Sequence, residues 1–147
     1  MASKQIIAYG AKVERSTDGT SGWTVIPEAK GIAVPVVEQD YQDVTSLDSE
    51  GGYRDYIKGL KDIGQITIPM GYTSAGYAAM IADQEAAHPI YYRVTMKPAP
   101  DQSTGDVFEF RGFPVPQLEA GDLGAPVGIN LNIRGTGAPT WTRGTEA

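Results

Sequence analysis

The sequence predicts a mainly β protein, a β-sandwich or barrel-like subunit with one flanking α-helix and a long protruding loop. Short runs of alternating apolar and polar residues recur along the 147 residues, as half-buried strands require. Eighteen glycines and ten prolines punctuate these runs. One stretch alone has the apolar spacing of a helix. The length corresponds to a single domain, residues 1–147.

The first two strands are expected at residues 5–14 and 23–26, after an N-terminal arm of residues 1–4. The loop between them contains Asp-Gly and Ser-Gly pairs, which suit a hairpin connection. The apolar run near the N-terminus is too short for a signal peptide or a membrane span. We therefore expect a soluble protein that makes no membrane contact.

Residues 31–46 form a long β-rich run with Pro35 near its start, a position typical of a strand edge or bulge. The run leads into residues 47–63, which are rich in glycine and charge and can bury little surface of their own. Residues 53–57 are nevertheless amphipathic and β-compatible. We therefore expect residues 47–63 to be an ordered protruding loop that needs a partner surface.

After an alternating strand at residues 65–72, residues 73–88 predict the helix. Tyr77, Met80 and Ile81 recur at helical spacing among alanines and are expected to pack the helix on the sheet. Thr73 or Ser74 can cap its start, and a proline at position 89 ends it.

Three more strands are expected at residues 90–97, 107–118 and 127–133. In residues 107–118, either Phe108 and Phe110 or Val107 and Phe113 face inward, and the prolines at 114 and 116 indicate an edge or a break. Residues 135–147 show no period, so we expect a mobile tail or one held only by a neighbour through Trp141.

Composition excludes several classes of function. The net charge of −6 opposes a main activity on nucleic acid or anionic membranes. The absence of cysteine excludes disulfides and thiolate metal sites. His88 is the single histidine and lies at the end of the predicted helix, which favours contact with terminal carbonyls over catalysis or metal binding. We expect no cofactor and no metal.

Three features of the protruding loop have a catalytic or binding interpretation. Asp48 and Glu50 could be a hydrolytic carboxylate pair, but a glycine-flanked loop lacks the burial and fixed spacing that such a pair needs. The glycines at 51, 52 and 59 are better hinges than a phosphate cradle, because no Lys-Ser or Lys-Thr pair follows. Tyr53 and Tyr56 could stack on carbohydrate, but mixed charges around them favour a protein interface. We expect no enzymatic activity.

The order of motifs in residues 43–68 resembles a known family. An acid and Thr-Ser, then Leu-Asp, Gly-Gly-Tyr-Arg, Ile-x-Gly-Leu-Lys-Asp and Gly-x-Ile-x-Ile follow one another. This order is similar to the middle of the major tail proteins, or tail tube proteins, of long-tailed bacteriophages of the siphophage type. The resemblance implies a structural subunit that forms hexameric rings, stacked around a channel through which DNA passes without specific binding. It also implies a place in the virion tail after assembly in the host bacterial cytoplasm, with tape measure, tail terminator and tail tip proteins as further partners.

The resemblance assigns roles to two groups of residues. The predicted ring-to-ring contact comprises Leu47, Asp48, Glu50, Gly51, Gly52, Tyr53, Arg54, Asp55, Tyr56, Ile57, Lys58, Lys61 and Asp62. A channel that passes DNA must not hold it, so its wall should be neutral or acidic. The lumen candidates are Glu38, Asp40, Gln42, Gln65, Thr67, Asn130 and Asn132. The face of Arg93 and Lys97 is expected to point outward or to pair with acids.

Other interpretations of the sequence stay open. A monomeric β-sandwich could use the same polar faces as a solvent-facing surface and act as a binding module, either in virion decoration or for a glycan or receptor. A subunit of a secretion-type tube would share the fold and the assembly. A hydrolase would use Asp48, Glu50 or Asp55.

Overall fold

The computed structural model describes residues 6, 9–119, 121 and 123–146. The predicted N-terminal arm therefore lies outside the described residues, as do residues 5, 7 and 8 of the predicted first strand. The elements in chain order are β1 (Lys12–Ser16), β2 (Thr24–Val25), β3 (Glu38–Asp43), a 3-10 turn η1 (Glu50–Gly52), β4 (Tyr56–Asp62), β5 (Gln65–Gly71), α1 (Ser74–Glu85), β6 (Ile90–Thr95), β7 (Val107–Leu118), β8 (Gly128–Gly135) and β9 (Thr140–Thr142).

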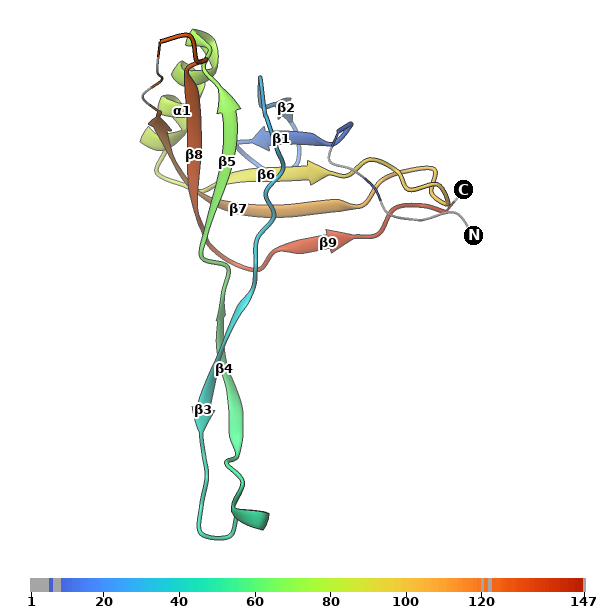
Figure 1. The fold of residues 1–147 in the computed structure, drawn as a ribbon, viewed down its shortest axis with the longest axis vertical. Helices are drawn as coiled ribbons and strands as arrows, with labels where there is room; N and C mark the ends of the chain where they lie inside the picture. The colour runs from blue at the N-terminus through green and yellow to red at the C-terminus, as the bar shows by residue number, and fades with distance from the viewer. Residues whose placement is uncertain (1–5, 7–8, 120, 122, 147) are drawn as a thin grey trace.

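One antiparallel sheet forms the body, in the order β2-β1-β6-β7-β8-β5, and β9 pairs with β7 outside this path (Figure 1). The first half of β7 pairs with β6 and β9, whereas its second half pairs with β8. The long strand thus belongs to two layers that cross at a steep angle (Figure 1). This arrangement confirms the prediction of a mainly β subunit with one flanking helix.

The turn between the two layers depends on glycine. Gly112 and Gly135 are register partners where β7 passes from one layer to the other. A Cβ on Gly112 would lie 2.5 Å from the Arg134 carbonyl oxygen, and one on Gly135 would lie 2.4 Å from the Ile63 side chain. Both distances are far inside van der Waals contact, so the chains cross this closely only because neither residue has a side chain.

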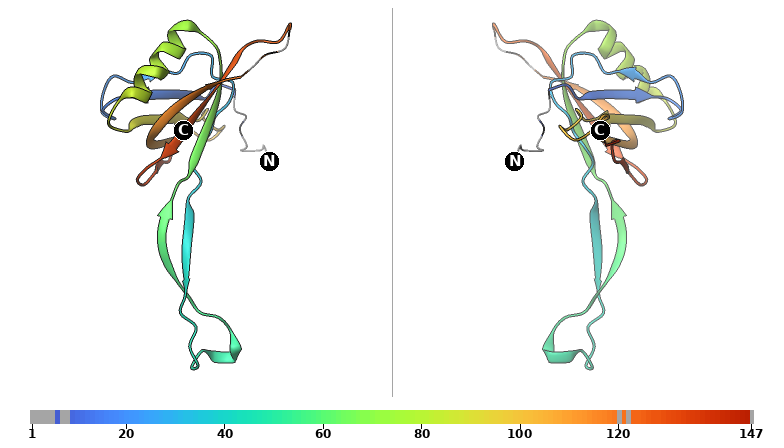
Figure 2. Two further views of the ribbon diagram at one scale, coloured as in Figure 1. Left: turned by 90° about the vertical axis from the view of Figure 1, so that its left-hand side faces the viewer. Right: turned by 90° about the vertical axis from the view of Figure 1, so that its right-hand side faces the viewer.

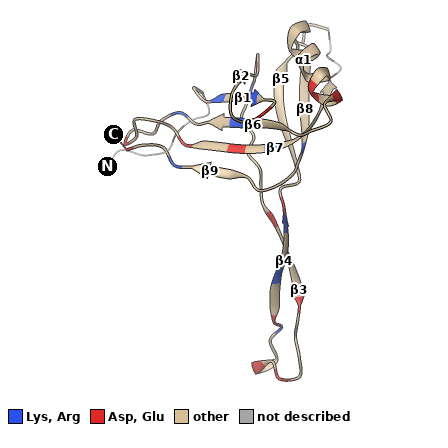
Figure 3. Ribbon diagram, turned by 180° about the vertical axis from the view of Figure 1, so that it is seen from behind, with Lys and Arg blue, Asp and Glu red and all other residues tan. Residues whose placement is uncertain are grey.

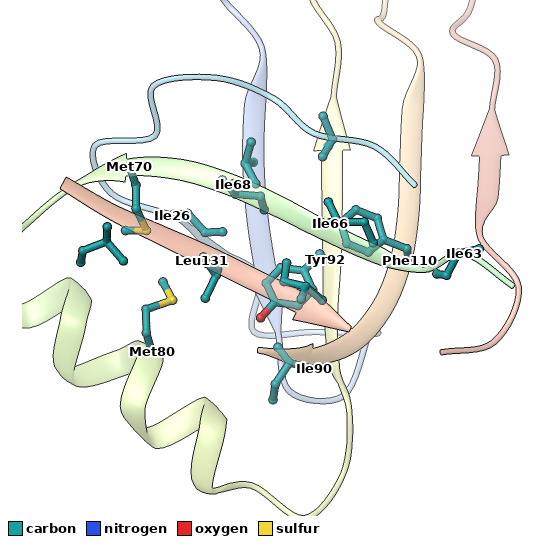
Figure 4. Close-up of a cluster of buried hydrophobic side chains, with 14 residues drawn as sticks. Ile26, Ile63, Ile66, Ile68, Met70, Met80, Ile90, Tyr92, Phe110 and Leu131 are labelled. Carbon is teal, nitrogen blue, oxygen red and sulfur yellow. The ribbon is translucent and has the colours of Figure 1, made fainter. Parts of the chain in front are cut away.

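The core lies between the two layers and the helix (Figure 4). Side chains at even-numbered residues of β5 and odd-numbered residues of β8 point inward, as the alternation predicted. Strand β6 contributes its even-numbered side chains to the same core. In β7, Phe110 is buried and Phe108 packs against the core, whereas Phe113 is 44% exposed. The structure thus selects the first of the two orientations that the sequence left open. Fourteen buried apolar side chains form the cluster: Val13, Ile26, Ile63, Ile66, Ile68, Met70, Met80, Ile90, Tyr92, Val94, Phe110, Ile129, Leu131 and Ile133.

Helix α1 begins where the sequence predicted and covers the inner side of the β5–β8 layer (Figure 2). The Thr73 hydroxyl accepts a hydrogen bond from the Gly76 N–H at 3.1 Å, which confirms the cap. The predicted stripe needs a correction, because Tyr77 and Ile81 are only half-buried and Met80 alone of the three is fully buried. Asp83 lies inside instead, since Arg15 on β1 reaches it across the helix–sheet interface.

Met80→Ala is expected to lower the free energy of unfolding by about 2–5 kcal/mol, because Met80 is 1% exposed and its removal leaves a cavity beneath the sheet. Ile81→Ala should cost less, since this side chain is partly exposed. Urea unfolding of the unassembled subunit measures both changes. Equal losses for the two variants would contradict the placement of the helix.

Strands β3 and β4 form a separate two-stranded ribbon that projects far from the body (Figures 1 and 2). The sequence predicted a protrusion at residues 47–63, but the projecting segment starts earlier, at Glu38. Residues 56–62, expected within a loop, are strand β4 in register with β3. The predicted strand at residues 31–46 is accordingly shorter, since only Glu38–Asp43 is β-structure.

The C-terminal segment also differs from the prediction of a mobile tail. Trp141 lies on β9, in register with Phe108 of β7, and the two rings are 6.5 Å apart. Beyond β9, Thr145 accepts a hydrogen bond from the Ser103 N–H at 2.9 Å. The tail is thus paired within its own chain, with a strand partner more than thirty residues away that no local period could indicate.

Candidate assembly surfaces

The ribbon of β3 and β4 is the most exposed part of the molecule. Every residue of β4 is exposed, and Leu60, Tyr53 and Tyr41 keep 83%, 77% and 59% of their surface accessible. An isolated two-stranded ribbon is at best marginally stable in water. Several exposed apolar side chains on such a ribbon are typical of a surface that a partner covers.

Hydrogen bonds within the ribbon tip define its shape before any partner binds. The Ser49 hydroxyl donates to the Asp55 carboxylate at 2.7 Å, and the Asp55 N–H donates to the Thr45 hydroxyl at 2.9 Å. Arg54 forms an exposed ion pair with Asp43 at 3.0 Å. The predicted contact residues of the tip are therefore brought together on an ordered end of the ribbon.

The ribbon also carries most of the net negative charge of the chain, which is −6. Residues 38–62 contain seven acidic and three basic side chains, a net charge of −4 (Figure 3). Hydrogen bonds from Thr45 lower the pKa of Asp43. The pKa of Asp62 is lowered by a hydrogen bond from the Gly64 N–H and, to a smaller extent, by Arg134. These carboxylates therefore keep their charge into the acidic range, so a partner surface should be neutral or basic.

A polar face lies on the outer side of the layer formed by β5, β8 and the second half of β7. The Thr67 hydroxyl donates to the Asn132 side chain at 2.9 Å, and the Asn132 amide donates to Gln117 at 3.1 Å. Asn130 donates to Glu119 in the same way. The four predicted lumen residues Gln65, Thr67, Asn130 and Asn132 thus share one face.

Sequence reasoning missed the rest of this face. Gln117 and Glu119 complete its hydrogen-bonded rows. The alternation of β7 is the signal that could have found them, because it puts both residues on the face opposite to Pro114 and Pro116. Arg134 adds a positive charge to the face and forms an ion pair with the Asp62 carboxylate at 3.0 Å. The other lumen candidates, Glu38, Asp40 and Gln42, lie on β3 in the ribbon and not on this face.

The opposite layer, formed by β1, β6, β9 and the first half of β7, has a charged outer face. Arg93 is paired with Glu14 at 3.2 Å and stacks on the Trp23 ring at 4.2 Å. Glu109 is its register partner on β7. Arg93 is thus paired with acid, as expected, whereas Lys97 is exposed. Charged side chains predominate on this layer, whereas amides and a hydroxyl predominate on the polar face.

A buried ion pair joins the helix to this layer. The Arg15 guanidinium donates to the Asp83 carboxylate at 2.5 Å, and both side chains are largely buried. Burial raises the pKa of Asp83, while Arg15 opposes that shift. Burial also raises the pKa of Tyr92, whose hydroxyl lies in the core without a hydrogen-bond partner among the described residues. The pair holds the helix in place and touches no candidate assembly surface.

The residues of the catalytic interpretations do not form a site. Asp48, Glu50 and His88 are exposed, Asp48 and Glu50 on the ribbon tip and His88 beyond the helix. In the described part of the chain, no group of three or more histidine and acidic side chains is placed to hold a metal ion. No helix there is long and apolar enough to cross a membrane.

Comparison with known proteins gives the fold and no sequence family. No family model and no curated protein matches the sequence. Solved structures match over nearly the whole chain. A chain of the anti-feeding prophage baseplate, 6-fold symmetrised, is 10% identical with a TM-score of 0.71, covering 97% of this chain and 98% of that one.

Two further structures agree with the first. A chain from the sheath/tube terminator of an extracellular contractile injection system, PVC, is 11% identical with a TM-score of 0.72, covering 97% of this chain and 99% of the other. A chain from the tail of an empty gene transfer agent particle, refined with C6 symmetry, is 18% identical with a TM-score of 0.63, covering 89% and 94%. The protein therefore has the fold of subunits found in tail and injection particles.

Proposed function

We propose that this protein is a structural subunit of a tail tube, which assembles as stacked hexameric rings around a channel for DNA. The observation that carries the proposal is the match, over 89–97% of this chain, to chains of three particles, two of them described with six-fold symmetry. The siphophage origin that the sequence resemblance implied is part of this proposal. Tape measure, tail terminator and tail tip proteins are its proposed further partners, and its proposed place is the virion tail after assembly in the bacterial cytoplasm.

Two surfaces have distinct roles in the proposed tube. The ribbon, residues 38–62, reaches the neighbouring ring, because its exposed apolar side chains need cover that its own body does not provide. The polar face of β5, β8 and β7 lines the channel. Its side chains are largely neutral amides and hydroxyls bonded to one another, and its one arginine is paired with Asp62.

Electron microscopy of the concentrated, purified protein tests this proposal. Rings or tubes with six-fold symmetry are the expected result. A protein that stays monomeric at every concentration contradicts the tube proposal and favours the binding module. A tube of a contractile or secretion-type injection machine is a second candidate, favoured by the match to a chain of an extracellular contractile injection system. Tubes that copurify with a sheath protein distinguish that candidate from a tail without a sheath.

Lysine at Gln65 and Asn132 is expected to make assembled tubes retain DNA, since each added cation neutralises a phosphate in every subunit of every ring. Retention should fall steeply between low and moderate salt. Thr95→Lys, on the opposite layer, is the matched control and should have no effect. Retention by the Thr95 variant alone would show that the other layer faces the channel.

A further inference from the structure

Three polar side chains meet inside the interface between helix α1 and the sheet. Arg15 on β1 and Tyr92 on β6 are register partners, so their side chains leave the two strands next to each other on one face. That face is the inner one, because Tyr92 is 0% exposed and belongs to the core cluster. Asp83 reaches the Arg15 guanidinium from the helix, at 2.5 Å.

The Tyr92 ring is fixed by packing, so its hydroxyl cannot turn to solvent. The ring stacks on Phe110, with centroids 5.6 Å apart and planes 20° from parallel. The hydroxyl oxygen points toward the side of the core that α1 covers (Figure 4). Burial is the main cause of the raised pKa of Tyr92, and Asp83 raises it further while Arg15 lowers it. Both charged groups therefore lie close enough to act on the hydroxyl.

Each of these three side chains keeps one buried polar atom without a partner among the described residues. The atoms are Arg15 Nε, Asp83 Oδ2 and the Tyr92 hydroxyl oxygen. Native proteins rarely leave such atoms unpaired, because a buried group that has lost its bonds to water is costly. The Nε–H only donates, the carboxylate oxygen only accepts, and the hydroxyl does both. The three atoms therefore need a common partner that can donate and accept.

A single water molecule has this capacity. It can accept from the Arg15 Nε–H, donate to Asp83 Oδ2, and use a further hydrogen or lone pair for the Tyr92 hydroxyl. Buried waters in proteins make about three hydrogen bonds of this kind. An ion fits less well, because a cation would meet the Arg15 charge and an anion would meet the Asp83 charge.

We propose that the interface between α1 and the sheet is a binding site for one structural water molecule, which bridges Arg15, Asp83 and Tyr92. The water extends the ion pair into a network that includes β6, so α1 is fixed to two neighbouring strands and not to β1 alone. Hydrogen bonds are directional, so a fully satisfied network sets the position of the helix along the sheet more strictly than apolar contacts do. The inference goes beyond the proposed tube and does not depend on it.

Tyr92→Phe tests the site through the sign of its effect on stability. The substitution removes the hydroxyl and keeps the stacked ring. If the water holds the hydroxyl, the loss of one hydrogen bond should lower the unfolding temperature of the monomeric subunit by about 2–4 °C. If the hydroxyl has no partner, the same change removes an unpaired buried group and raises the unfolding temperature. A rise overturns the proposal.

The double variant Arg15→Met with Asp83→Leu provides the matched background. It removes two of the three groups that bind the water, so Tyr92→Phe should raise the unfolding temperature in this background. An effect of Tyr92→Phe with the same sign in both backgrounds overturns the bridge, because the hydroxyl would then not depend on the other two groups. Tyr91→Phe, at the adjacent position on the opposite face of β6, is the control and should leave the unfolding temperature unchanged.

A crystal structure that shows ordered water gives a direct readout and does not depend on any variant folding. A density peak within hydrogen-bond distance of all three atoms is the expected result. Well-ordered density without that peak, or a direct bond from the Tyr92 hydroxyl to Asp83, overturns the proposal. Neither measurement requires assembly, so a failure of the proposed tube function and a failure of the water site are seen in different experiments.

Discussion

A subunit without the ribbon is expected to fold normally and to form no tubes. Gln39 and Lys61 are register partners at the base of the ribbon, so an Asn-Gly turn can join them in place of residues 40–60. The deleted residues contribute nothing to the core cluster, which lies wholly in the body. The deletion should therefore leave the unfolding temperature of the body nearly unchanged while removing the contact between rings.

Circular dichroism, sedimentation and electron microscopy measure the three parts of this expectation. Tyr41→Ser with Leu60→Ser is a milder variant, which keeps the backbone and removes two exposed apolar side chains of the ribbon. It should shorten or abolish tubes. Val25→Ser, at an exposed apolar position on β2, is the matched control and should assemble as wild type. Wild-type tubes from the deletion would exclude the ribbon as the ring-to-ring contact.

The second large effect is expected from the buried ion pair. Asp83→Ala removes the carboxylate and leaves the Arg15 guanidinium buried without its partner. Losing one member of a buried pair typically costs about 3–5 kcal/mol, a large part of the roughly 5–15 kcal/mol that stabilises a domain. Asp83→Ala should therefore lower the free energy of unfolding more than any exposed substitution.

The subunit without the ribbon is the suitable background for this measurement, because assembly would otherwise add to the apparent stability. Arg15→Met with Asp83→Leu replaces the pair by apolar side chains and should recover most of the loss. If Asp83→Ala changes the unfolding free energy by less than about 1 kcal/mol, the helix is held by its apolar contacts alone.

The sequence determined much of the fold because several elements carry their own local signals. The alternation in residues 65–72, 90–97 and 127–133 gave the strands and their buried faces, since burial on one side follows directly from a period of two. The Thr73 cap and the alanine-rich stretch after it gave the helix. Glycine and charge in residues 47–63 predicted a protrusion outside the core, which holds except at the last residue, because Ile63 belongs to the core cluster.

Only the tertiary structure decided which strands are neighbours and which polar groups lie inside. Arg15 and Asp83 are 68 residues apart, so no local pattern distinguishes the buried Asp83 from a solvated helix residue. The pairing of β9 with β7 likewise depends on partners distant in sequence. Alternation tells which face a proline occupies but not whether its missing N–H points to a neighbour or to an open edge. That direction is set by the hydrogen bonds of the assembled sheet.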